Sequence, residues 1–81
     1  MLNGKIPIGI IHSTKDIGKA VRVKRKSAGL TQADAAALCG VGARFLGELE
    51  RGKASAQIGK VIRIMQGLGL ELQIVPKGVN R

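Results

Sequence analysis

The chain has 81 residues, and its 14 Lys and Arg against 5 Asp and Glu give a formal net charge of +9. This length suffices for one domain, and the charge favours a polyanionic partner, with nucleic acid ahead of a membrane surface. A membrane-surface helix usually carries aromatic anchors, whereas this sequence holds one Phe and neither Trp nor Tyr. His12 is the only histidine, and it has no cluster of Cys, Asp or Glu beside it. We therefore expect a binding protein and not an enzyme, with no metal, no other cofactor and no membrane partner.

Residues 1–12 are expected to form an arm or a short strand. Ile residues alternate within Lys5–Ile11, and Pro7 restricts such a strand to the edge of a sheet. Pro and Gly also stand where a signal peptide needs helix formers, and no segment approaches the about 18 apolar residues of a membrane span. The lone Cys39 is interpreted as a small buried hydrophobe, with an exposed redox-active thiol as the alternative. We expect a cytoplasmic protein.

A first helix is predicted from Ser13 to about Ser27. Ser13 and Asp16 have the spacing of a capping box, and Gly29 follows as a helix terminator. Four of the basic residues of this helix form a stripe along one side: Lys15, Lys19, Arg22 and Lys26. Such a stripe is either a solvated helix face or a row of phosphate contacts, and the next segment favours the phosphate contacts.

Residues Thr31–Lys53, TQADAAALCGVGARFLGELERGK, predict a helix, a tight turn, a second helix and a stop. The hydroxyl of Thr31 can cap the first helix of this pair, and Asp34 three residues later completes a capping box. Gly40-Val41-Gly42 gives the backbone freedom for a sharp reversal, and Gly52 can end the second helix in the left-handed conformation. This is the layout of a DNA-reading helix-turn-helix.

The second helix of this pair is expected to carry the base-reading residues on its outer face. There Ala43 could meet a thymine methyl, Arg44 could bind guanine O6 and N7, and Gly47 could leave room for the DNA. The alternative for Arg44 is an i,i+4 ion pair with Glu48 on a solvated helix. Gln32, in the preceding helix, is expected to reach a phosphate or an adenine. Further phosphate contacts are assigned to the basic stripe and to Thr31, Arg51 and Lys53.

Two charged residues are expected to face inward. Arg25 follows Val21 by four residues, and Glu50 follows Leu46 by four, so each continues an apolar helix face. Two inward charges should be partners, because breaking a buried pair is costly. We predict an ion pair between Arg25 and Glu50 that fixes the angle between their helices.

After a linker at Lys53–Ser55, a last helix is predicted over Ala56–Gly67, with Ser55 as its N-cap. Its apolar residues lie almost all the way round, so one side is expected to pack on the domain and the other on a second subunit. Residues 70–76 alternate as a half-buried strand does, and a lone strand must pair with its symmetry mate, with the N-terminal segment, or with both. Residues 77–81 are expected to form a flexible basic tail. The expected dimer contacts are Ile62, Met65, Leu70, Leu72 and Ile74.

The segments LTQADAA, GVGARFL and ELERGK resemble the XRE/lambdoid-repressor helix-turn-helix family over about Ile17–Leu68. Within that range, GARFLGELERGK followed by IGKVIRIMQGLGLELQIV resembles the HipB-type antitoxin branch. The resemblance implies an all-α, lambda-repressor-like domain of four or five helices over residues 13–69. It also implies dimerisation partly through a short C-terminal β-strand, repression of the protein's own operon, and binding to a HipA-type serine/threonine kinase toxin. On the matching motifs it supports the base-reading and ion-pair positions named above: Gln32, Ala43, Arg44, Gly47, and Arg25 with Glu50.

We therefore predict a homodimeric, sequence-specific repressor of double-stranded DNA with a palindromic operator, in the role of a HipBA-type antitoxin. One alternative is a solitary XRE-type repressor without a toxin. The other is a small basic RNA-binding protein, although RNA binders favour aromatic stacking platforms and the aromatic content here is 1%. A DNA-binding role implies the bacterial cytoplasm, at the nucleoid when DNA is bound.

Overall fold

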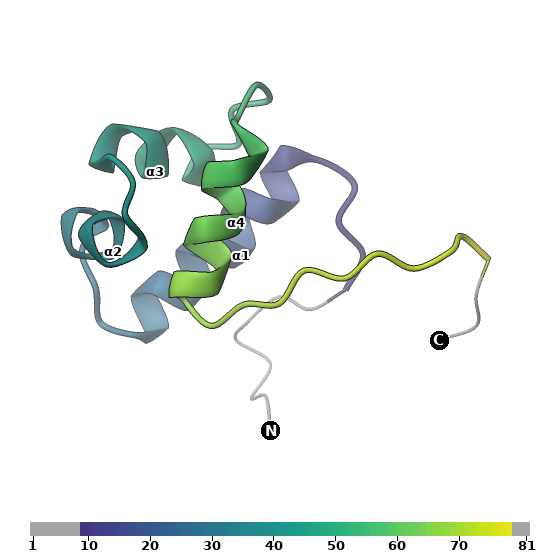
Figure 1. Cartoon of the computed structure of the whole chain (residues 1–81), viewed down its shortest axis with the longest axis horizontal. Coiled ribbons are helices and arrows are strands. Elements are labelled where there is room, and N and C mark those ends of the chain that lie inside the picture. Colours follow the sequence, from purple (N-terminus) through teal and green to yellow (C-terminus); the bar gives the residue numbers. More distant parts are fainter. Residues whose placement is uncertain (1–8, 79–81) are drawn as a thin grey trace.

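Four helices make up the folded body within residues 9–78. The computed structural model describes residues 9–78, with α1 at Thr14–Ser27, α2 at Gln32–Cys39, α3 at Ala43–Glu50 and α4 at Ile58–Gly67. α3 packs against both α1 and α2, and α4 packs against α2 (Figure 1). The expected all-α class with four helices is confirmed.

The core is formed by one apolar face of each helix. Its largest fully buried side chains are Val21 of α1, Leu46 and Leu49 of α3, and Ile64 of α4. α2 contributes small residues, and Cys39 at its C-terminal end is buried as expected of a small hydrophobe. Burial raises the pKa of the Cys39 thiol, which disfavours a redox-active thiolate.

α1 and α3 approach each other most closely at Gly18, a contact that the sequence analysis did not predict. A Cβ at this position would overlap the backbone carbonyl oxygen of Leu49, and it would lie 3.1 Å from that of Glu50. Only a residue without a side chain allows the two helices this close. The crossing therefore sets the C-terminal end of α3 against α1.

The ends of α2 and α3 follow most of the predicted signals, but within residues 9–78 the Asp34 carboxylate accepts no hydrogen bond from the Thr31 amide, so only half of the predicted capping box forms. The Thr31 hydroxyl accepts a hydrogen bond from the backbone N–H of Asp34 at 3.0 Å, which caps α2. Gly40 ends α2 in the left-handed conformation, with φ 71°. Gly52 has φ 84° and donates to Leu49 at 2.9 Å, while Lys53 donates to the carbonyl of residue 48 at 3.0 Å. These two bonds form the Schellman arrangement that terminates α3.

The capping box predicted at the start of α1 is wrong. Ser13 occupies the N-cap position, but its side chain makes no cap hydrogen bond. The Asp16 carboxylate accepts instead from the backbone N–H of His12 at 2.9 Å. Ser13 is fully extended, with φ −158° and ψ 170°, and the carboxylate takes the amide one residue earlier than predicted.

α4 begins at Ile58, two residues later than predicted, and Ser55 does not cap it. Gln57 is the N-cap residue, again without a side-chain cap hydrogen bond. Ala56 packs partly buried against the core, so the residues before Ile58 cover the domain as a loop. On α4 itself, Met65 is 6% exposed and belongs to the chain's own core, whereas Ile62 remains 36% exposed. Met65 therefore keeps little surface for a second subunit.

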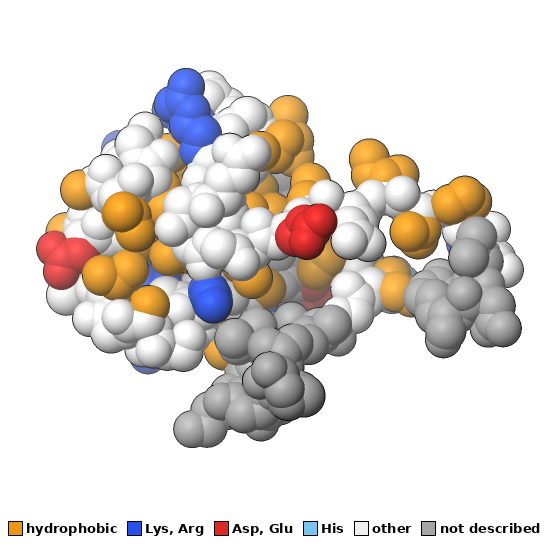
Figure 2. All heavy atoms as spheres, turned by 60° about the horizontal axis from the view of Figure 1, so that its bottom comes forward, with side chains coloured by type: hydrophobic (Ala, Val, Ile, Leu, Met, Phe, Trp, Pro, Cys, Tyr) orange, Lys and Arg blue, Asp and Glu red, His pale blue; other side chains and the backbone are white. Residues whose placement is uncertain are grey.

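The expected C-terminal strand is not present in the described part of the chain. Leu70 packs partly on the core, and the residues after it leave the helical body (Figure 1). Apolar side chains lie exposed along this segment (Figure 2), with Leu72 exposed by 46% and Ile74 by 95%. A strand needs a neighbour for its backbone groups, and residues 9–78 offer none. The predicted N-terminal strand lies largely outside the described residues, as do residues 79–81 of the predicted tail.

Candidate nucleic-acid interface

The turn between α2 and α3 is closed by contacts from two sides. The backbone N–H of Val41 donates to the Ala36 carbonyl at 3.0 Å. From α4, Arg63 makes a long hydrogen bond of 3.5 Å to the Gly40 carbonyl, a contact for which the sequence carries no local signal. α2, the turn and α3 therefore form one helix-turn-helix unit supported by α4.

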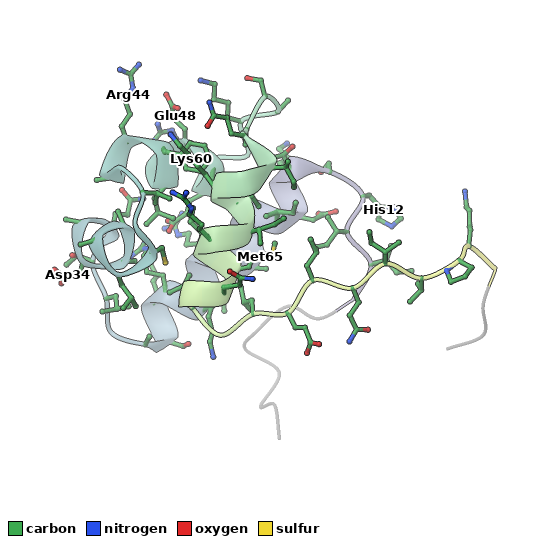
Figure 3. The ribbon with its side chains drawn as sticks, in the orientation of Figure 1. His12, Asp34, Arg44, Glu48, Lys60 and Met65 are labelled. Carbon is green, nitrogen blue, oxygen red and sulfur yellow. The ribbon has the colours of Figure 1, made fainter. Side chains whose placement is uncertain are left out.

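The first turn of α3 presents Arg44 to solvent. The Arg44 side chain is 90% exposed and points away from the helical body (Figure 3). Its Nε lies 3.3 Å from Oε2 of Glu48, so the i,i+4 pair considered as the alternative is present. An ion pair this exposed contributes little to stability, and it leaves the Nη1 and Nη2 groups of the guanidinium available for another acceptor. Ala43 is exposed at the same end of α3. Base contacts by Ala43 and Arg44 stay predictions.

Gly47 does not lie on the exposed face of α3, where the sequence analysis expected it. It is buried, and a Cβ there would lie 3.3 Å from Oε1 of Gln32 and 3.5 Å from Nη1 of Arg51. These two side chains fill the space above α3 that the glycine leaves. A larger residue at position 47 would displace Gln32 before it could obstruct DNA.

Arg25, Gln32 and Glu50 form one network that joins α1, α2 and α3. Arg25 donates from Nε to Oε2 of Glu50 at 2.6 Å and from Nη2 to Oε1 at 2.9 Å. Gln32 donates from Nε2 to the same Oε1 at 3.1 Å. The remaining Nη1 of Arg25 donates to the Leu30 carbonyl at 2.8 Å. Arg25 and Glu50 thus meet as predicted, whereas the amide of Gln32 is held by Glu50 in the free protein.

The network keeps both charges in place at neutral pH. Burial raises the pKa of Glu50, but hydrogen bonds from Arg25 and Gln32 and the charges of Arg25 and Arg22 outweigh it and hold the pKa below its ordinary value. The hydrogen bond to Glu50 raises the pKa of Arg25 against the opposing effect of burial. Every buried side-chain nitrogen or oxygen within residues 9–78 has a hydrogen-bond partner. The C-terminal end of α3 is therefore fixed to α1 and α2.

Basic side chains surround that end of α3. Lys15 packs against Gly52, where a Cβ would lie 2.7 Å from Cγ of Lys15. Arg22 is close enough to Glu50 to lower its pKa, so the α1 stripe borders the end of α3. All seven expected phosphate contacts are exposed: Lys15, Lys19, Arg22, Lys26, Thr31, Arg51 and Lys53. Their contacts with phosphate stay predictions.

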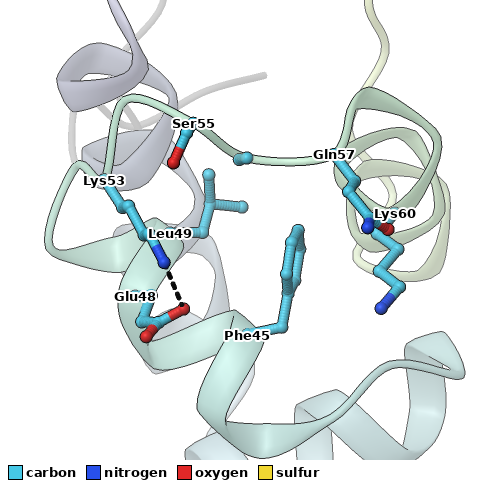
Figure 4. A pocket seen from close by; sticks show the side chains of 8 residues that line it. Phe45, Glu48, Leu49, Lys53, Ser55, Gln57 and Lys60 are labelled. Atoms are coloured by element: carbon cyan, nitrogen blue, oxygen red, sulfur yellow. Dashed lines mark hydrogen bonds and ion pairs between the residues drawn. The ribbon is translucent and has the colours of Figure 1, made fainter.

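A further group that the sequence analysis did not single out lies between α3 and α4. The Phe45 ring points into a surface cavity of about 170 Å³, and Nζ of Lys60 lies 5.4 Å from the ring centroid (Figure 4). On the rim of this cavity, Nζ of Lys53 lies 3.3 Å from Oε1 of Glu48. Glu48 therefore has two basic partners, one on α3 and one in the following loop.

The described residues offer no metal site. Within residues 9–78, no three His, Cys, Asp or Glu side chains lie close enough together to hold a metal ion. None of the helices in this part of the chain combines the length and the apolar character needed to cross a membrane.

Comparison with known proteins agrees with this geometry. The profile of the family described as Helix-turn-helix matches residues 21–75. The HTH-type transcriptional regulator y4mF of Sinorhizobium fredii is 45% identical over 71 residues, which cover 88% of this chain and 93% of that protein. Chains from the HipA-HipB-O2-O3 complex and from the HipB-O4 20mer complex share the fold. Each superposes with a TM-score of 0.77 at 20% identity, over 86% of this chain and 99% of that chain. The chain therefore belongs to the XRE-type helix-turn-helix family of transcriptional regulators.

Proposed function

We propose that the chain is a sequence-specific DNA-binding repressor that acts as a homodimer on a palindromic operator. The observation that carries this proposal is the arrangement of α3. Its first turn presents Ala43 and Arg44 to solvent, while Glu50 in its last turn is tied to Arg25 and Gln32. A side chain that reads base edges must extend from a helix whose position is fixed. α3 meets both conditions, because Arg44 extends into solvent and Glu50 holds the helix in place.

Each residue of this surface has a distinct proposed role. Arg44 binds guanine O6 and N7, and Ala43 meets a thymine methyl. Gln32 lies in the first turn of α2, where backbone N–H groups favour a phosphate, and its hydrogen bond to Glu50 positions α3. Gly47 acts indirectly, because the absence of a side chain at this position lets Gln32 pack against α3. The exposed basic residues around the end of α3 contact phosphates.

A second copy is proposed to cover the apolar C-terminal surface. Ile62, Leu70 and Leu72 line a shallow cavity of about 270 Å³, with Met65 and Gln66 beside them. Pairing the 70–76 segments of two copies, with Ile74 in the contact, would satisfy their backbone groups. Repression is then steric, because two α3 helices about 34 Å apart occupy successive major grooves.

In vitro selection from a randomised pool of duplexes tests this proposal. We expect the full chain to recover an inverted repeat whose half-sites lie one helical turn apart, because a two-fold dimer presents two copies of α3. Recovery of a single unrepeated site would contradict the dimer, and recovery of no preferred sequence would contradict sequence-specific binding.

On the recovered duplex, Arg44→Ala is expected to weaken binding by about 1–3 kcal/mol per half-site. The reason is the loss of a bidentate guanine contact while the phosphate contacts remain. Fluorescence anisotropy on the recovered and a scrambled duplex measures the change. Lys77→Ala is the matched control, because it removes one positive charge from an exposed position after the 70–76 segment, and it should change the affinity for both duplexes equally. Equal losses on both duplexes for Arg44→Ala would remove this residue from the base-reading role.

We further propose that the repressor is the antitoxin of a HipA-type serine/threonine kinase. The resemblance of α3 and the C-terminal region to the HipB branch supports this, as does the likeness of fold to a chain of the HipA-HipB-O2-O3 complex. We expect a kinase-like reading frame next to this gene, whose product co-purifies with the chain. If no such frame is present, the solitary repressor is the correct alternative.

The structure favours DNA over the RNA-binding alternative. The chain has one aromatic residue, Phe45, and its ring lies between α3 and α4 with Lys60 beside it. The ring therefore does not provide the open stacking platform that single-stranded RNA recognition uses.

A further inference from the structure

Glu48 lies next to the proposed base-reading residue on a surface that is otherwise basic. It follows Arg44 by one helical turn on α3, and its side chain is 23% exposed (Figure 3). Oε2 of Glu48 lies 3.3 Å from Nε of Arg44, and Oε1 lies 3.3 Å from Nζ of Lys53 (Figure 4). A carboxylate near DNA phosphates opposes binding by Coulomb repulsion. Its place on this face therefore lowers the affinity for any DNA on which no other contact offsets the repulsion.

The contact leaves one particular edge of Arg44 available. Glu48 holds Nε, while Nη1 and Nη2 have no hydrogen-bond partner within residues 9–78, and the side chain is 90% exposed. Those two nitrogens form the fork that can donate end-on to O6 and N7 of one guanine. A guanidinium already held through Nε loses less conformational freedom when it binds.

The second partner of Glu48 explains how its charge persists. The hydrogen bond from Lys53, together with the Lys53 charge and the contact with Arg44, lowers the pKa of Glu48 against a smaller effect of burial. The carboxylate is therefore ionised at neutral pH. Because Glu48 holds Lys53, that ammonium must give up this carboxylate before it binds a phosphate, on any sequence.

We propose that Glu48 is the residue that sets sequence specificity through Arg44: it orients the guanidinium toward guanine and penalises DNA that lacks this base. The inference rests on the proposed function. On a duplex with the guanine, Arg44 binds the base through its Nη fork and still neutralises Glu48 through Nε. On a duplex without it, the Nη groups find no acceptor, and the carboxylate repels the phosphates.

Glu48→Gln tests the inference, with Asp34→Asn as the matched control that removes one carboxylate charge from an exposed position on α2. Binding is measured by anisotropy on the duplex selected by the wild-type chain, on a scrambled duplex, and on the selected duplex with 7-deazaguanine at the base that Arg44 reads. We expect Glu48→Gln to reduce the preference for the selected duplex by about tenfold or more, with tighter binding to the scrambled one. Asp34→Asn should change the affinity for both duplexes equally. The loss caused by 7-deazaguanine should shrink in Glu48→Gln, a change that a merely structural role would not produce.

Three outcomes would overturn the inference. The first is a preference that survives Glu48→Gln while the wild-type chain remains selective, which leaves the proposed function intact. The second is an additive effect of Glu48→Gln and Arg44→Ala in the double variant, which would mean that Glu48 acts without Arg44. The third is a wild-type chain that selects no preferred duplex, which overturns the proposed function and this inference together.

Discussion

Glu50→Ala is expected to lower the free energy of unfolding by about 3–5 kcal/mol. The change removes both carboxylate contacts of Arg25, which is only 8% exposed, and leaves its charge with the Leu30 carbonyl alone. It also removes the acceptor of Gln32, so α2 and α3 lose a connection. Urea unfolding followed by circular dichroism measures the loss.

Adding Arg25→Met to Glu50→Ala should recover much of this loss, because a buried apolar side chain needs no counter-charge. Glu71→Ala serves as the control, since it deletes an exposed carboxylate outside the network and should be close to neutral. If the effects of Arg25→Met and Glu50→Ala simply added, the two residues would not act as a pair.

The same network makes stability depend on pH in a defined direction. The folded-state pKa of Glu50 lies below its ordinary value, which is about 4.3 in an unfolded chain. The contribution of this group is therefore fully present above that unfolded value and is lost as the pH falls through the folded-state pKa. The melting temperature of the wild-type chain should accordingly fall more steeply as the pH is lowered than that of the Arg25→Met, Glu50→Ala double variant.

Gly18→Ala is expected to destabilise the fold by about 3 kcal/mol or more, at the upper end of overpacking effects. Helix propensity alone predicts the opposite sign, because Ala in a helix interior is more favourable than Gly by about 1 kcal/mol. The new Cβ would overlap the Leu49 carbonyl oxygen and lie 3.2 Å from the carbonyl carbon of Glu50. Backbone atoms of a packed helix cannot rotate away as the end of a long side chain can.

Gly59→Ala is the matched control, because this α4 glycine is exposed and a Cβ there meets nothing within 4 Å. The Gly59→Ala variant should be more stable than the wild type by about 0.5–1 kcal/mol, because Ala has the higher helix propensity. Chemical denaturation measures the change in the free energy of unfolding for both variants. A Gly18→Ala chain as stable as the wild type would show that α1 and α3 can move apart at little cost.

The helix-turn-helix could be predicted from the sequence because its signals are local. Thr31 caps α2 through the amide of Asp34, and Gly40 and Gly52 end their helices in the left-handed conformation. The pairing of Arg25 with Glu50 followed from apolar periodicity, since each charge continued an inward face. Such features depend on neighbours within one or two turns, or on a face that the helix period defines.

Features set by the approach of distant segments escaped prediction. A glycine in a sequence does not reveal which segment will pack against it. The sequence therefore does not identify Gly18 as the point where α1 and α3 cross, or Gly47 as the residue against which Gln32 packs. Likewise, α4 begins two residues later than predicted, because Ala56 packs against the core as part of the preceding loop. In the candidate site, the i,i+4 spacing of Arg44 and Glu48 was visible, but the second contact of Glu48 with Lys53 depends on how the chain turns after α3.

The two faces of the eight-residue helix α3 have different roles. The inward residues hold the helix in the domain, and they are Leu46, Leu49 and Glu50. The outward residues make no contact with the core, and they are Ala43, Arg44 and Glu48. Under the proposed function, mutations at the outward positions would change the preferred operator without disturbing the core. A library restricted to these three codons would then sample new operator preferences on an unchanged scaffold.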